Sequence, residues 1–246
     1  MSILSKERYL GVDVGNFTYG QLKNRILSDI NNNVKSFIVA INPEKILTAQ
    51  KDHELINLLN GATYQIPDGV GILLASRMKK GKIRERITGI DTFVGLCELA
   101  ADHGKSVFLY GAKPGIAEKA TEELKKMFPH LKVAGFLHGY EKDQDYVKQT
   151  INEAKPDILF VALGSPNQEY WIVENMDQLN VKVFQGVGGS FDVISGQVKR
   201  APKFFQKIGC EWLYRLLIEP SRIRRQFKLP LFLFKVLFVK KSKEQR

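Results

Sequence analysis

Cysteine, histidine and long apolar runs are scarce in this chain of 246 residues. Its two cysteines, Cys97 and Cys210, are too few for a disulfide framework, which favours a reducing compartment. The four histidines show no metal-ligand spacing with each other or with the cysteines, so no structural zinc site is expected. No run approaches the roughly 20 apolar residues that a membrane-spanning helix needs. The first residues lack the apolar core of a signal peptide, and a cytoplasmic protein is expected.

Two common nucleotide-binding motifs are also missing. The chain has neither a GxxxxGK[ST] P-loop nor a complete GxGxxG, which disfavours an ATPase and an ordinary NAD-dependent enzyme. Apolar residues make up 44% of the chain and charged residues 26%, so a globular protein with a sizeable core is expected. The length suits one large domain, or a domain with an appendage.

Positive charge is concentrated near the carboxyl terminus. Residues 199–246 carry 14 Lys and Arg against 3 acidic residues, whereas the preceding residues carry 23 of each sign. Such a segment indicates an anionic partner, which would be a membrane surface, a nucleic acid or a phosphorylated substrate. The sequence therefore predicts a body at residues 1–197 and a basic appendage at residues 198–246.

Strand and helix patterns alternate along the body. Thr18 and Gln21 form a capping-box pattern at the start of a helix that runs to about residue 31. Further helices are expected at 44–59, at 116–128 and through Trp171. Apolar runs typical of buried strands occur at 36–41, 106–110, 132–136, 157–163 and 181–185. This alternation predicts an α/β fold with a parallel sheet, flanking helices and ligands beyond the carboxyl ends of the strands.

A turn rich in Pro and Gly holds a carboxylate. Pro67 and Gly69 flank Asp68, and a basic segment with Arg84 and Arg86 follows. Because Pro fixes one backbone dihedral and Gly tolerates positive φ, Asp68 is predicted on a shaped loop, where catalytic side chains are often held. The arginines offer planar donors to a phosphate. Taken alone, these residues suit an Asx-type turn and a solvated basic segment at least as well.

Two other features have simpler interpretations. Gly111 and Gly115 fall at a strand–helix turn, where glycine most often serves the backbone geometry. The triplet at residues 143–145, Asp-Gln-Asp, has the composition of the metal-binding carboxylate pair of many nucleotide-sugar transferases. It also lies at the start of an expected helix, where acidic residues favour the helix dipole. The helix-start interpretation is preferred.

Several loop motifs occur in order along the chain. They are IPDG at 66–69, RITG at 86–89, GSPNQE at 164–169, GVGGSFD at 186–192 and RAP at 200–202. Together with GVDV at 11–14 and EWLYRL at 211–216, they resemble the WecG/TagA/CpsF family, the bacterial transferases of glycosyltransferase family 26. The resemblance covers nearly the whole chain.

The resemblance implies a Rossmann-like body with a membrane-targeting carboxyl-terminal appendage. It implies transfer of a sugar from a UDP-sugar donor to an undecaprenyl-diphosphate-linked acceptor. The best-studied branch moves N-acetylmannosamine onto N-acetylglucosamine in teichoic acid synthesis, with inversion and without a metal, so no cofactor is expected. Two alternatives stay open. One is the same fold with another UDP-sugar, for capsule or exopolysaccharide, and the other is a non-catalytic UDP-sugar-binding membrane scaffold.

Site residues follow from matching positions. Asp68 corresponds to the family's proposed base, Arg86 to its active-site arginine and Asn42 to a polar position at a strand end. Ala40 stands where the resemblance implies a threonine, which leaves the identity of the sugar open. Beside the glycine turns, the candidates for nucleotide or sugar contacts are Gln168, Gly188 and Asp192. Helix capping is the alternative role for Gln168 and Asp192.

The tail adds three arginines. Arg215, Arg222 and Arg225 would contact the diphosphate of UDP or of the acceptor if the appendage folds over the site, as the resemblance implies. Basic residues beside Trp and Phe suit an interfacial helix on anionic lipid, at the inner face of the plasma membrane. A helix that packs on a protein partner is the alternative, and no recognised motif supports nucleic-acid binding. The family also suggests a homo-oligomer.

Overall fold

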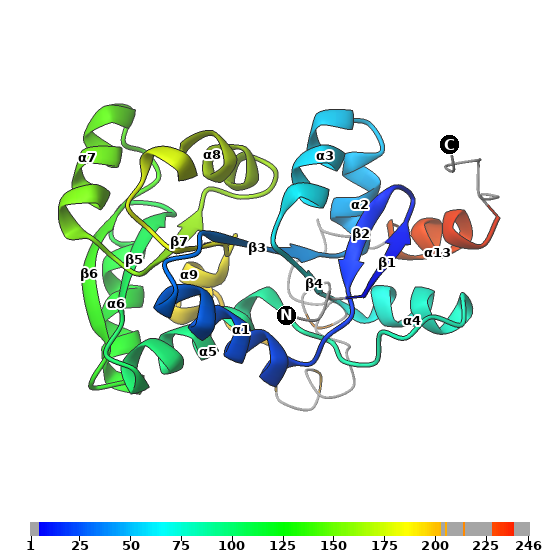
Figure 1. Ribbon diagram of the computed structural model, residues 1–246, viewed down its shortest axis with the longest axis horizontal. Helices are drawn as coiled ribbons and strands as arrows, with labels where there is room; N and C mark the ends of the chain where they lie inside the picture. Colours follow the sequence, from blue (N-terminus) through cyan, green and yellow to red (C-terminus); the bar gives the residue numbers. More distant parts are fainter. Residues whose placement is uncertain (1–4, 203–204, 206–213, 215–227, 239–246) are drawn as a thin grey trace.

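The computed structural model describes residues 5–202, 205, 214 and 228–238. Its centre is a six-stranded parallel sheet in the order β4-β3-β8-β7-β5-β6 (Figure 1). The strands are β3 (Ser36–Ile41), β4 (Tyr64–Pro67), β5 (Ser106–Gly111), β6 (Lys132–Leu137), β7 (Ile158–Ala162) and β8 (Val183–Gly186). The predicted α/β fold with a parallel sheet is therefore confirmed.

Helices cover both faces of the sheet. The helices of the body are α1 (Tyr19–Asn31), α2 (Pro43–Ala49), α3 (His53–Gly61), α4 (Val70–Met78), α5 (Gly89–Asp102), α6 (Ile116–Met127), α7 (Gln144–Ala154), α8 (Asn167–Asn175), the 3₁₀ helix η1 (Met176–Gln178) and α9 (Ser190–Ile194). Alternate strand residues enter different cores. Ile38 belongs to the core that α1, α5, α6 and α9 share, whereas Val39 belongs to the core that α2, α3, α7 and α8 share.

Two further elements join the body from the ends of the chain. The antiparallel strands β1 (Lys6–Tyr9) and β2 (Val12–Gly15) form a hairpin, and the helix α13 (Lys228–Phe238) lies beside it (Figure 1). Phe232 and Val236 of α13 are buried in the same core as the hairpin and α2. A carboxyl-terminal helix is thus present, while the division of the chain at residues 197 and 198 stays a prediction.

The predicted helix starts are confirmed in detail. The Thr18 side chain accepts from the Gln21 N–H and the Gln21 side chain accepts from the Thr18 N–H, which completes the capping box of α1. The Asp143 side chain caps α7 by accepting from the Tyr146 N–H at 3.0 Å. This carboxylate therefore begins a helix, as the preferred interpretation has it.

The structure differs from the sequence-based expectations at several elements. The single helix expected at 44–59 is two helices, because the Asp52 side chain accepts from the Leu55 N–H at 3.0 Å and starts α3 as a new helix. Strand β4 was not expected, since it contains the polar Gln65, whose buried amide donates to three backbone carbonyls. The β1–β2 hairpin was also not expected.

The sheet contains a crevice between β3 and β8. After β3 the chain turns into α2 on one face, and after β8 it turns into α9 on the other. Because the two connections diverge, they leave space beyond the carboxyl ends of these adjacent strands. Such a switch point is where open α/β sheets bind ligands.

Candidate active site

A pocket of about 420 Å³ opens at this crevice. It is lined from four strand ends: the residues after β3, after β4, after β7 and after β8. The segment before α5 and the first residues of α13 complete the lining. The candidates Asn42, Asp68, Arg86, Gln168 and Gly188 all line this one pocket, so the structure brings together residues that are far apart in the sequence.

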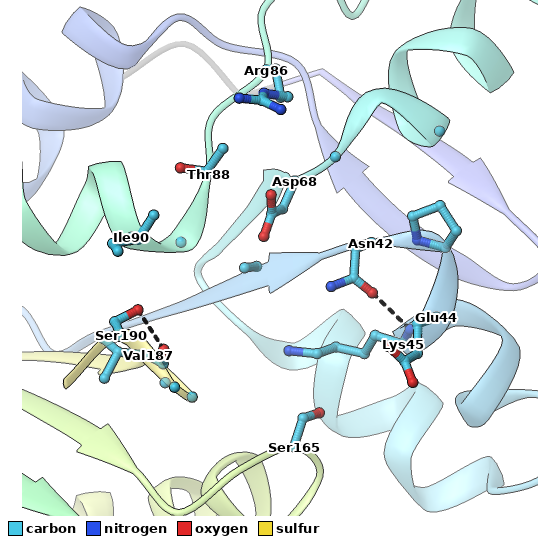
Figure 2. A pocket seen from close by; sticks show the side chains of 18 of the residues that line it. Asn42, Glu44, Lys45, Asp68, Arg86, Thr88, Ile90, Ser165, Val187 and Ser190 are labelled. Atoms are coloured by element: carbon cyan, nitrogen blue, oxygen red, sulfur yellow. Dashed lines mark hydrogen bonds between the residues drawn. The ribbon is translucent and has the colours of Figure 1, made fainter. Parts of the chain in front are cut away.

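Asp68 is held where β4 ends. Its N–H donates to the Ile41 carbonyl at 2.9 Å, and the following Gly69 has φ +88°, a conformation that favours glycine. The half-buried carboxylate lies beside the amino terminus of α5, where a Cβ atom added to Gly89 would be 3.9 Å from Asp68 Oδ2. Figure 2 shows the carboxylate directed into the pocket. A carboxylate in this position could act as a general base.

Arg86 enters the pocket from the segment that precedes α5. The Ile87 N–H donates to the Pro67 carbonyl at 3.0 Å, which places this segment alongside the end of β4. Thr88 then caps α5, as its hydroxyl accepts from the Asp91 N–H at 3.1 Å. Arg84, two residues earlier, is exposed and is not part of the pocket lining. The backbone therefore separates two arginines that the sequence presents together.

Asn42 occupies the end of β3. Its side-chain oxygen accepts from the Lys45 N–H at 2.9 Å and caps α2. The amide nitrogen is left on the pocket side (Figure 2). Ala40 also lines the pocket, and a Cβ on Gly89 would lie 3.4 Å from the Ala40 Cβ. The position where a threonine was expected is therefore at the site, although this chain has only a methyl group there.

Gln168 joins two sides of the pocket. Its side-chain oxygen accepts from the Gly188 N–H at 2.9 Å, and its nitrogen donates to Glu169 Oε1 at 2.9 Å. The amide packs so closely on β8 that a Cβ on Gly186 would lie 2.7 Å from Gln168 Nε2. Its side chain does not cap α8, and what it does instead is fix the turn between β8 and α9.

Asp192 is the candidate residue that comes from α9. It is in the first turn of α9, whose N-cap is Gly189, and no side-chain hydrogen bond caps this helix. Its carbonyl accepts from the Val198 N–H at 2.9 Å. Among the described residues it is absent from the pocket lining. Arg215, Arg222 and Arg225 lie outside the described residues.

Sequence reasoning missed an ion pair in the pocket wall. Lys45 Nζ lies 2.7 Å from Glu169 Oε1, and these side chains are 7% and 0% exposed. Burial raises the pKa of Glu169, but the Lys45 ammonium and the Gln168 amide lower it by more than burial raises it. The net pKa therefore lies below the ordinary value. No local signal marks this pair, because its members come from α2 and α8 and meet only in the fold.

The helix α13 contributes to the pocket mouth. Lys228 and Leu229 line the pocket, and Lys228 Nζ lies 2.9 Å from Glu44 Oε1 of α2. Leu229 packs on α4 so closely that a Cβ on Gly71 would lie 2.5 Å from Leu229 Cδ1. The outer side of α13 presents four exposed apolar side chains, named here the α13 ridge. They are Leu231, Phe234, Leu237 and Phe238.

The described part of the chain offers neither a metal-binding cluster nor a membrane-spanning helix. There, no three or more His, Cys, Asp or Glu residues are grouped so that they could hold a metal ion. No helix within the same residues is long and apolar enough to cross a membrane.

Comparison with known proteins gives a consistent result. Residues 7–246 match the model of a family described as the glycosyl transferase WecG/TagA/CpsF family. Curated relatives carry the name N-acetylglucosaminyldiphosphoundecaprenol N-acetyl-beta-D-mannosaminyltransferase. The relative from Bacillus spizizenii is 40% identical over 85% of this chain and 81% of its own length. Those from Bacillus subtilis and Staphylococcus aureus MRSA252 are each 36% identical, over 87% and 97% of this chain and 84% and 94% of their own lengths.

Proposed function

The chain belongs to the WecG/TagA/CpsF family of glycosyl transferases, and from this premise we propose its substrates. The donor is UDP-N-acetylmannosamine, and the acceptor is N-acetylglucosamine linked to undecaprenyl diphosphate. The names of the relatives support the transferred sugar and the acceptor. The observation that carries the proposal is one pocket that holds a carboxylate, Asp68, and a guanidinium, Arg86, at the switch point of the sheet.

The proposed mechanism is a single displacement with inversion. Asp68 accepts the proton of the attacking acceptor hydroxyl as that oxygen bonds to the anomeric carbon. The bond from the anomeric carbon to the UDP oxygen breaks in the same step, and the electron pair leaves with UDP. Arg86 stabilises the negative charge that develops on the departing diphosphate. We further propose that Arg215, Arg222 and Arg225 add to this stabilisation and that transfer needs no metal ion.

The proposed location is the inner face of the plasma membrane. The α13 ridge would enter the lipid interface, and the 14 basic residues of 199–246 would attract anionic lipid. Because Lys228 and Leu229 of the same helix line the pocket, docking at the membrane would bring the lipid-linked acceptor to the site. Self-association, which the family resemblance implies, is a further proposal that light scattering tests.

The alternative is a different donor sugar, and one observation favours it. Ala40 lines the pocket with a methyl group where the resemblance implies a threonine hydroxyl. A lost hydroxyl changes which sugar oxygens find a partner, and such differences set sugar specificity. Another UDP-sugar, used for capsule or exopolysaccharide, would then be the substrate.

A transfer assay tests both versions. The full chain is incubated with an undecaprenyl-diphosphate-linked N-acetylglucosamine acceptor and, separately, with UDP-N-acetylmannosamine, UDP-N-acetylglucosamine, UDP-glucose, UDP-galactose and UDP-N-acetylmannosaminuronic acid. Product formation with N-acetylmannosamine supports the main proposal, and preference for another sugar supports the alternative. UDP-sugar binding without transfer from any donor would instead support a membrane scaffold.

A further inference from the structure

The ion pair between Lys45 and Glu169 has a feature that the proposed mechanism does not use. The Lys45 ammonium carries three N–H donors, and one donates to Glu169. Within the described part of the chain, the hydrogen bonds of this ammonium include no second acceptor. The side chain lines the pocket, and Figure 2 shows its nitrogen directed into the cavity near Ser165. Two donors are therefore available to a ligand.

The charge of this ammonium is balanced inside the protein. The pKa of Glu169 lies below its ordinary value, so its carboxylate is ionised at neutral pH and lies 2.7 Å from the ammonium. The pair as a whole adds little net charge to the pocket. A neutralised cation is a poor counter-charge for a diphosphate, but it remains a strong and directional hydrogen-bond donor.

The geometry of the pair also restricts its movement. Gln168 donates to the same Glu169 oxygen and accepts from Gly188, so the carboxylate that holds Lys45 is itself held. A donor fixed in this way suits an acceptor atom whose position is equally defined, such as the hydroxyl or amide carbonyl oxygen of a bound sugar ring.

We propose that Lys45, held by Glu169, is a sugar-recognition residue that donates to a neutral oxygen of the sugar in this pocket. The inference rests on the proposed glycosyl transfer and adds a binding contact to it. The oxygen belongs either to the donor sugar or to the acceptor sugar, and the chemistry of recognition is the same. In this proposal the arginines bind the diphosphate, and Lys45 binds the sugar.

The variant for the test removes both charges. Replacing Lys45 alone would strand a buried carboxylate and endanger the fold, so Lys45→Met is combined with Glu169→Gln, which keeps an oxygen for the Gln168 amide. The matched control is Lys182→Met, whose ammonium pairs with Asp157 at 3.3 Å at the amino-terminal end of β8. Thermal unfolding of each variant shows that it is folded.

Three quantities are compared with the wild type: the Kd of the UDP-sugar, the Kd of UDP alone and the KM of the lipid-linked acceptor. We expect the double variant to weaken either the UDP-sugar or the acceptor by about tenfold or more, since hydrogen bonds to charged groups have this magnitude. The ligand whose binding weakens shows whether Lys45 contacts the donor sugar or the acceptor sugar. UDP alone should change by less than about threefold, and Lys182→Met should change none of the three.

Two results would overturn the proposal. Equal weakening of UDP and UDP-sugar would mean that the ammonium binds the diphosphate. Unchanged values for both sugars would mean that the pair only supports the fold. If the wild type transfers no sugar, the proposed function fails, but the Kd of the acceptor, measured in place of its KM, and the binding comparison between UDP-sugar and UDP still decide the role of Lys45.

Discussion

The ring of Phe232 packs edge-on against the ring of Tyr9, with centroids 6.4 Å apart and planes at 66°. These residues come from α13 and β1, near opposite ends of the chain. Phe232 is fully buried, whereas Phe234, two residues later on the same helix, is 60% exposed. One side of α13 therefore belongs to the protein core, and the other side is available to a different environment.

This contrast predicts different costs for two similar substitutions. Phe232→Ala removes a buried ring and should lower the free energy of unfolding by about 3–5 kcal/mol. Phe234→Ala should change it by less than about 0.5 kcal/mol, since its ring is mostly in solvent. Urea denaturation of both variants measures the difference. Equal losses would contradict the described packing of α13.

The α13 ridge should control membrane binding. Phe234→Ala combined with Phe238→Ala removes two exposed rings and should weaken binding to vesicles with anionic lipid by tenfold or more, because burying each ring contributes about 1.5–3 kcal/mol. Raising the salt concentration should also weaken the binding of the wild type to these vesicles. Vesicle flotation measures both effects, with vesicles of neutral lipid as the control. Binding that is indifferent to salt and to the two rings would refute the proposed docking.

Asp68→Asn should abolish most of the transfer while leaving the binding of UDP-sugar nearly intact. An amide has nearly the same shape as the carboxylate but cannot accept the proton of the acceptor hydroxyl, so kcat should fall by about 10²–10⁴-fold. Asp143→Asn, which alters a helix cap on α7, is the control and should leave kcat unchanged. Kinetic assays and calorimetry measure the two effects. Full activity of Asp68→Asn would exclude this residue as the base.

The two neighbouring arginines provide a matched comparison. Arg86 lines the pocket and Arg84 does not, so Arg86→Met should lower kcat by about 10²–10³-fold and Arg84→Met by less than about threefold. The same assay with EDTA should leave the wild-type rate unchanged, since the proposed charge stabilisation comes from arginine. Similar losses in both variants would contradict the assignment of Arg86, and a rate that depends on added metal would refute the proposed metal independence.

Asp157 should make stability depend on pH. Burial raises its pKa, but the Ser106 N–H at 2.9 Å and the Lys182 ammonium lower it to a net value below the ordinary one. Its contribution is therefore present above the pKa of the unfolded chain, near 4, and is lost as the pH falls through the folded value. Between pH 6 and pH 3 the wild type should lose more unfolding free energy than Asp157→Asn. Parallel pH profiles would show that Asp157 makes no such contribution.

Local rules predicted much of this fold correctly. Thr18 and Asp143 were recognised as helix starts, because a cap depends on residues three or four positions away. Apolar runs indicated most strands of the sheet, because a buried strand consists of neighbouring apolar residues. Strand β4 was not predicted because Gln65 interrupts its apolar character. The burial of the Gln65 amide depends on carbonyls around the end of α3.

The site was predicted less completely than the fold. Asp68 and Arg86 were found through motifs, and the structure places both in one pocket, although their chemical roles stay predictions. The pair of Lys45 and Glu169 was not found, because most strands of the sheet lie between the two residues in the sequence. Neither residue belongs to a pattern with a fixed spacing. Asp192 shares a motif with Gly188 but lies outside the described pocket lining, whereas Ser190 and Val193 of the same helix belong to it.

The two hydrogen bonds of Gln168 restrict which amino acids can occupy this position. Its oxygen accepts from a backbone N–H while its nitrogen donates to a carboxylate, so this position needs an uncharged side chain with both an acceptor and a donor. Glutamate would bring a second negative charge against Glu169, lysine could not accept, and asparagine is one methylene too short to reach both partners. A saturation library at this position should therefore return glutamine far more often than glutamate, lysine or asparagine.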